Sequence, residues 1–269
     1  MAVITGLNMA VNGENTNRMF QITTSNELRR YSASNTQSGA GRRCGIDEWK
    51  GMYLGYGSTP AVFPGDFFTF AGSVDGTNGW VSATNGAYCE QIDIVGNIEE
   101  QQYLQYAVHF SRSGSITPGA AEYSDDTLPA PPCTNSLTVN RGSVDEDDVR
   151  FYHLVMRCPG RKYNSSSTDG GYQRKRGVFD AFLEYHRYFS NPTTLPALER
   201  DYAMRLNTTT VPEFWDLAWM KAAKIEAIVN TETQENMGAK IFMEFNGHNG
   251  TATGYCKTPA AVEKWPFTT

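Results

Sequence analysis

The chain contains two copies of one stretch of sequence, and this repeat restricts its fold more than any other feature. Residues 29–70 align with residues 161–202 at a constant shift of 132 positions and without a gap. Such self-similarity predicts that the chain is built from two similar structural units. The matching pairs are Arg29/Arg161, Tyr31/Tyr163, Ser34/Ser166, Thr36/Thr168, Gly39/Gly171, Arg42/Arg174, Gly45/Gly177, Tyr53/Tyr185, Tyr56/Tyr188, Ser58/Ser190, Pro60/Pro192 and Pro64/Pro196, with Phe70/Tyr202 among the conservative pairs.

The repeat and the length of 269 residues together predict two domains. We expect the first at 1–120 and the second at 149–269, each large enough to bury its own core. Residues 121–148 differ in composition, because they hold a proline-rich run and the acidic run Asp145–Asp148. Proline-rich segments are extended and semi-rigid, so we expect a linker there. The acidic run lacks the spacing and the glycine of a calcium loop and is interpreted as a solvated charge run.

The composition favours a mainly β fold. Glycine (25 residues) and proline (12 residues) are frequent and long helical patterns are few, which is typical of strands joined by turns. Residues 88–98 alternate between apolar and polar side chains, the period of a half-buried strand.

Residues 214–229 set the repeat against local propensity, because they are good helix formers. With a one-residue gap, Lys224–Val229 aligns with Gln91–Gly96 of the first copy, and its apolar residues alternate. We therefore predict a strand. Ile241–Phe245 aligns with Tyr106–Phe110 if a few further residues of gap are allowed.

Two polar runs occupy equivalent positions in the copies, Ser32–Gly41 and Asn164–Gly171, and each has cations on both sides. Such runs cannot bury enough apolar surface to pack against a core. We expect exposed loops or the tips of long hairpins.

No catalytic or metal-binding motif is recognisable. The four histidines fall on different expected elements and the five cysteines have no CxxC spacing. GxSxG elbows, P-loops and GxGxxG fingerprints are absent. We expect neither a secretory signal nor a membrane span, since the first residues lack a basic region before an apolar run and no apolar stretch reaches about 18 residues. The expectation is a non-enzymatic protein with reduced thiols, no cofactor and no metal.

The net charge of −6 is unevenly distributed. Residues 1–138 carry 7 basic and 13 acidic side chains, whereas residues 139–269 carry 16 of each. An acidic chain lacks the basic footprint that grips nucleic-acid phosphates. The surplus of acid either aids solubility or lines a passage through which nucleic acid slides, and the charge alone leaves both readings open.

Four runs of the first copy resemble the tail-tube proteins of long-tailed bacteriophages: Thr36–Gly51, Tyr56–Phe70, Gln91–Glu99 and Val108–Gly114. The resemblance covers most of the first copy and, through the repeat, much of the second. The second copy departs from it at Phe179, where the first has Asp47, and at Pro196-Ala-Leu, where the first has Pro64-Gly-Asp.

This resemblance implies two tandem β-sandwich domains of the tube type, with room for one short helix in each and long loops between rings. Two-domain members of the family form trimeric rings of pseudo-sixfold outline, and the rings stack into the tube through which the genome is ejected. Implied partners are further copies of the chain, other tail proteins and double-stranded DNA that passes without sequence-specific binding, and no membrane. The implied location is the virion tail, assembled in the host cytoplasm.

The same resemblance assigns candidate site residues. Acids that repel DNA must lie close to its path, because salt screens charge within about 8 Å at physiological ionic strength. Candidate inter-ring contacts are Arg30, Ser34, Thr36, Gly39, Arg42, Arg43, Lys162, Ser166, Thr168, Gly171, Arg174 and Lys175. Candidate acids facing the lumen are Asp93, Glu99 and Glu100. Two alternatives stay open: another virion component (neck, tail terminator, baseplate or capsid decoration), and a carbohydrate-binding or enzymatic β-sandwich.

Overall fold

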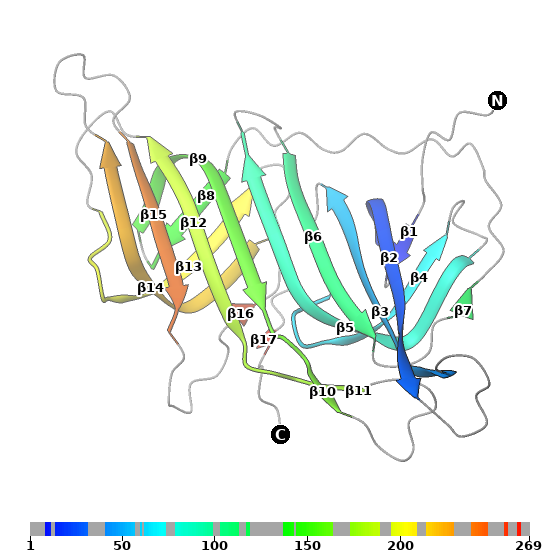
Figure 1. Cartoon of the computed structure of the whole chain (residues 1–269). Helices are drawn as coiled ribbons and strands as arrows, with labels where there is room; N and C mark the ends of the chain where they lie inside the picture. Colours follow the sequence, from blue (N-terminus) through cyan, green and yellow to red (C-terminus); the bar gives the residue numbers. More distant parts are fainter. Residues whose placement is uncertain are drawn as a thin grey trace.

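The computed structural model of the chain confirms a mainly β fold (Figure 1). No helix occurs in the part of the chain that the structure describes, and so none there could cross a membrane. The described residues are 9–11, 14–31, 41–56, 60, 62–73, 79–98, 103–112, 117–118, 137–142, 144–163, 173–188, 195–208, 214–228, 238–246, 256–257 and 263–264.

The strands fall into two sets that follow the repeat. The first set is β1 (Met9–Val11), β2 (Glu14–Tyr31), β3 (Gly41–Tyr56), β4 (Phe67–Ser73), β5 (Gly79–Asn97), β6 (Tyr103–Arg112) and β7 (Thr117–Pro118). The second set is β8 (Leu137–Arg141), β9 (Val144–Arg157), β10 (Arg161–Tyr163), β11 (Gln173–Lys175), β12 (Asp180–Tyr188), β13 (Asp201–Thr208), β14 (Phe214–Ile228), β15 (Gly238–Phe245), β16 (Cys256–Lys257) and β17 (Glu263–Lys264).

Each half is an antiparallel structure whose strand order closes on itself. The first half runs β5-β4-β1-β2-β3-β6 and returns to β5. The second half runs β14-β13-β8-β9-β12-β15 and returns to β14. Both halves therefore have two layers, with β1 and β4, or β8 and β13, behind the remaining strands (Figure 1).

The two halves are joined edge to edge by β5 and β9. These strands pair antiparallel over seven consecutive positions, from Gln91 opposite Arg157 to Asn97 opposite Phe151. The junction creates one continuous layer of eight antiparallel strands, in the order β2-β3-β6-β5-β9-β12-β15-β14. Figure 1 shows this layer running across the front of the molecule.

The strand pairings repeat at the same shift of 132 positions as the sequence. Tyr31 lies opposite Gly41 in the β2–β3 pair, and Tyr163 lies opposite Gln173 in the β10–β11 pair. Strand β9 with β10 therefore corresponds to β2, and β11 with β12 corresponds to β3. Further equivalent pairs are Arg30/Arg42 with Lys162/Arg174, Phe20/Tyr53 with Tyr152/Tyr185, and Ile22/Gly51 with Leu154/Leu183.

The strand expected for residues 214–229 is confirmed, because β14 occupies Phe214–Ile228. Two details of the alignment were wrong. Ile225 lies opposite Ile241 in the second copy, and Ile92 lies opposite Val108 in the first. Both residues of the pair are therefore shifted by 133 positions, and no larger gap is needed between β14 and β15. Tyr202 corresponds to Phe68 and not to Phe70. Tyr202 lies opposite Met220 of β14 and Phe68 lies opposite Ala87 of β5, and these two partners are equivalent at a shift of 133.

The second half begins earlier than the expected linker allows. Strand β8 lies inside the segment 121–148 and pairs with both β9 and β13, as β1 pairs with β2 and β4. Residues 137–142 and 144–148 therefore belong to the second structural unit. Residues 121–136 lie outside the described residues.

The core fills both halves and runs through the junction. One cluster of buried side chains includes Tyr53 and Phe110 of the first copy, and Leu154 and Tyr185 of the second. Burying such apolar and aromatic surface is the main stabilising contribution in a fold of this kind.

Candidate functional site

The continuous eight-stranded layer has one face packed on the core and one face turned away from it, which we call the open face. Exposed or half-buried residues alternate with buried ones along β5, β6, β12 and most of β15, as expected for a sheet covered on one side. The polar and charged open-face residues include Gln21, Thr23, Ser25, Glu48, Lys50, Gln91, Asp93, His109, His153, Arg157, Asp180, Glu184, His186, Lys224, Glu226, Lys240 and Glu244.

Charge on the open face is mixed, with a small excess of acid. Among the residues named above, six are Asp or Glu and four are Lys or Arg. Interspersed signs prevent a strongly positive stripe of the kind that holds nucleic-acid phosphates. The face is therefore of mixed charge and is not a basic binding surface.

Asp93 lies on the open face at the junction of the copies. Its Oδ2 atom is 3.0 Å from Nε2 of His109 and accepts a hydrogen bond of 2.8 Å from Gln91, while its Oδ1 atom is 3.7 Å from Nε2 of His153. Burial opposes ionisation, but the hydrogen bonds from His109, His153 and Gln91 outweigh it and hold the pKa of Asp93 well below its usual range. Of the three lumen candidates, Glu99 and Glu100 lie outside the described residues.

A second cluster ties the β10–β11 hairpin of the second copy to the first copy. Arg174 is only 6% exposed, and its Nη2 and Nη1 atoms lie 3.1 Å and 2.9 Å from Oε1 of Glu48 and Glu90. Arg174 also donates hydrogen bonds to the carbonyl oxygens of Arg112 (3.3 Å) and Gly160 (3.2 Å).

Further cations complete this cluster. Lys162 binds the same Glu48 carboxylate, and Arg176 donates to the carbonyl of Gly65 at 2.7 Å and lies 3.4 Å from Asp66. Burial acts to raise the pKa of Glu48, but Lys162, Lys50 and Arg174 lower it below its ordinary value. The hairpin and Arg176 after it are thus held to the first copy by ion pairs and hydrogen bonds.

The structure places the candidate inter-ring residues differently from one another. Arg30 lies opposite Arg42, and Arg43 lies opposite Arg29, at the end of the β2–β3 ladder where the chain passes from β2 to β3. The equivalent hairpin carries Lys162 and Lys175 at these positions. Lys175 is exposed, whereas Arg174 is enclosed between the copies and has little surface for another chain. The remaining candidates lie outside the described residues: Ser34, Thr36, Gly39, Ser166, Thr168 and Gly171.

Sequence reasoning missed the partners of this cluster. Neither Glu48 nor Glu90 belongs to a sequence motif that would mark it as a site residue. The signal was weak because each acid is far in sequence from its cation: 126 positions separate Glu48 from Arg174. Only knowledge of the β5–β9 pairing brings them together.

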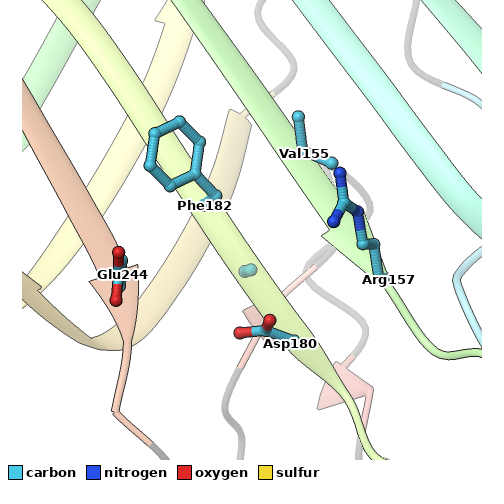
Figure 2. Close-up of a pocket in the computed structure, with 6 residues that line it drawn as sticks. Val155, Arg157, Asp180, Phe182 and Glu244 are labelled. Carbon is cyan, nitrogen blue, oxygen red and sulfur yellow. The ribbon is translucent and has the colours of Figure 1, made fainter.

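One depression on the open face has a volume of about 380 Å³ and lies over three adjacent strands of the second half. Figure 2 shows the labelled side chains, from β9, β12 and β15. No group of three or more His, Cys, Asp or Glu side chains there, or elsewhere among the described residues, is arranged to hold a metal ion. The lining residues are Val155, Arg157, Asp180, Ala181, Phe182 and Glu244.

Comparison with known proteins found no family model that matches the chain and no matching curated protein sequence.

Proposed function

We propose that this chain is a structural virion protein, a ring-forming subunit that stacks into the tail tube of a long-tailed bacteriophage. The observation that supports it best is the shared sheet: two copies of one unit, in the same register, contribute four strands each to one continuous layer. A chain of this design supplies two equivalent positions around a ring. The resemblance to tail-tube proteins supplies the biological setting.

A ring of three chains would contain 24 strands around its lumen. At a strand spacing of about 4.8 Å, its backbone circumference would be about 115 Å and its diameter roughly 37 Å before any allowance for strand tilt. Such a ring is wide enough to enclose a DNA duplex after side chains are added. Closing the ring also removes the sheet edges that would otherwise invite uncontrolled association.

In this proposal the open face lines the lumen. Its mixture of polar groups and its slight excess of acid offer no basic stripe on which DNA would be retained. Asp93 would face the passing DNA, with its carboxylate held in place by His109 and His153. The protein therefore acts as a conduit without catalysis, cofactor or sequence-specific contact, and it lies in the tail after assembly in the host cytoplasm.

The hairpin ends of the two copies are the proposed contacts between stacked rings. Deleting Ser34–Gly41 is expected to abolish stacking and leave single rings, because among the described residues the deletion removes only Gly41, at the start of β3. Sedimentation and microscopy of the deletion variant provide the measurement. Tubes of normal length would remove this role from the loop.

Negative-stain microscopy of the purified full chain tests the function as a whole. Long hollow tubes are the expected result. Closed single rings or binding to capsids would instead support another virion component, such as a neck or terminator protein. Monomers with no tendency to assemble would contradict the proposal.

A carbohydrate-binding β-sandwich is the second candidate, and the depression in Figure 2 is the observation that favours it. Phe182 offers an apolar surface beside the polar groups of Arg157, Asp180 and Glu244, a combination found in small-molecule sites. Glycan-array binding that is lost in an Asp180→Ala variant, by a chain that stays monomeric, would favour this reading over the tube.

A further inference from the structure

The eight-stranded layer ends in two strands with an unpaired edge among the described residues. At one end, β2 has β3 on one side, and its other side is paired with β1 only at Glu14 and Asn17. At the other end, β15 pairs with β14 as far as Ile228. Strands β13 and β16 pair with β14 only as far as Lys221 and Leu217, respectively. Two stretches therefore present open edges, Met19–Ser25 and Lys224–Ile228.

The molecule already contains the partner arrangement that these edges lack. Strand β9 is the repeat of β2, and β14 is the repeat of β5. Inside the chain, β5 and β9 pair with each other along one edge of each strand. That edge of β5 corresponds to the open edge of β14, and that edge of β9 corresponds to the open edge of β2. The β5–β9 junction is thus a template for pairing β14 with β2.

These two open edges cannot meet within one chain. They lie at opposite ends of the eight-stranded layer, which places them about 33 Å apart at the usual spacing between strands. A second copy of the chain therefore offers each open edge a complementary edge. This contact is head-to-tail, so it closes into a ring if the rotation between units allows it.

We propose that β14 of one chain pairs antiparallel with β2 of the next, in the register of the β5–β9 junction. This inference rests on the ring-forming part of the proposed function and not on the tail assignment. Transferring the pairs Gln91/Arg157, Ile92/Met156, Asp93/Val155, Ile94/Leu154 and Val95/His153 by the repeat gives Lys224/Ser25, Ile225/Thr24, Glu226/Thr23, Ala227/Ile22 and Ile228/Gln21.

The transferred register is chemically consistent. Lys224 and Glu226 contact each other on β14, and across the new junction they face Ser25 and Thr23. No like charges are therefore placed directly opposite one another, which would be unfavourable. All four side chains are exposed in the single chain, as a contact surface requires.

The template also fixes which backbone groups bond across the junction. Ile98 N–H donates to the carbonyl of Arg150, and Cys158 N–H donates to the carbonyl of Glu90. Antiparallel ladders bond at every second position, so Ile92 and Ile94 direct their N–H groups toward β9. Their repeat positions, Ile225 and Ala227, direct theirs toward the neighbouring chain.

A disulfide cross-link tests the register directly. The variant Thr23→Cys with Glu226→Cys places two cysteines opposite each other on the open face, within the reach of a disulfide. The matched control, Met19→Cys with Glu226→Cys, shifts one cysteine by four residues, or about 13 Å along the strand, which is beyond that reach. After mild oxidation with copper phenanthroline, the first variant is expected to give covalent oligomers on non-reducing gels, at least tenfold more than the control and the unmodified protein.

A backbone substitution provides an independent test. Ala227→Pro removes the N–H group that points to the neighbouring chain and leaves the bonds to β15 in place, a position where proline is tolerated on an edge strand. Ala227→Thr keeps the N–H group and is the matched control. The proline variant is expected to be a folded monomer by circular dichroism and sedimentation, while the threonine variant assembles.

The outcomes separate this inference from the tail proposal. If the variant with cysteines at positions 23 and 226 cross-links and forms rings but no tubes, the β14–β2 junction is supported and the tail-tube proposal is overturned. Tubes in which the Met19 control cross-links as well as the test pair, or in which neither does, overturn the register alone. Monomers of every variant, without cross-links, overturn both.

Discussion

Arg174 of the second copy binds Glu48 of the first, with 3.1 Å between Nη2 and Oε1, although Arg174 is one of the inter-ring contact candidates that the resemblance assigns. The same guanidinium contacts Glu90, 2.9 Å away, and is almost fully buried. Arg174 therefore links the β10–β11 hairpin of the second copy to the first copy. Its burial makes it a residue of the subunit interior.

Replacing Arg174 with alanine is expected to destabilise the chain by about 3 kcal/mol, because it takes the paired cation from the partly buried Glu90 and leaves Glu48 with Lys162 but without its buried cation. Urea unfolding followed by tryptophan fluorescence measures the change. Arg161→Ala in the same hairpin is the control, since Arg161 is exposed, and we expect a change of less than about 0.5 kcal/mol there. Equal effects at the two sites would contradict the role given to Arg174.

Heat is expected to unfold the two copies together. They share one sheet through seven β5–β9 pairs and one continuous core cluster, so opening either half exposes the other. Calorimetry at low protein concentration should show one transition whose van't Hoff and calorimetric enthalpies agree. Two resolved transitions would indicate that the copies are independent domains.

One pair of facing core residues differs in size between the two copies, and this difference allows a test by a compensating substitution. Gly51 faces Phe110, whose ring occupies the space that a side chain at Gly51 would need. The equivalent pair is Leu183 with Met243. Gly51→Leu alone is expected to cost about 3 kcal/mol through overpacking, and adding Phe110→Met should recover at least half of that cost. A double variant no more stable than the single one would contradict the equivalence.

Asp93 is expected to contribute to acid sensitivity. Its pKa in the folded chain lies below its usual range, so its stabilising contribution is complete above the unfolded pKa of about 3.9 and is lost as pH falls toward the folded value. Asp93→Asn should therefore cost about 1–2 kcal/mol at pH 7 and flatten the decline of stability below pH 4. Stability curves of Asp93→Asn and of the exposed control Asp180→Asn measure this. Parallel acid limbs for the wild type and Asp93→Asn would refute it.

Much of the fold was predictable because the repeat is a non-local signal that can be read from sequence. It identified β14 as a strand although residues such as Leu217, Ala222 and Glu226 favour a helix. It could not reveal β8, because the surrounding proline-rich and acidic composition hides a five-residue strand. The burial of Arg174 was also hidden, since it depends on the β5–β9 pairing, a choice between edges that local periodicity does not encode.

The most direct test of the account is electron cryo-microscopy of the assembled full chain. We expect a hollow tube in which each chain contributes eight adjacent strands to the lumen wall, with β14 next to β2 of the neighbouring chain and Asp93 facing the lumen. Assemblies whose open face points outward would contradict the account, as would a chain that stays monomeric at high concentration.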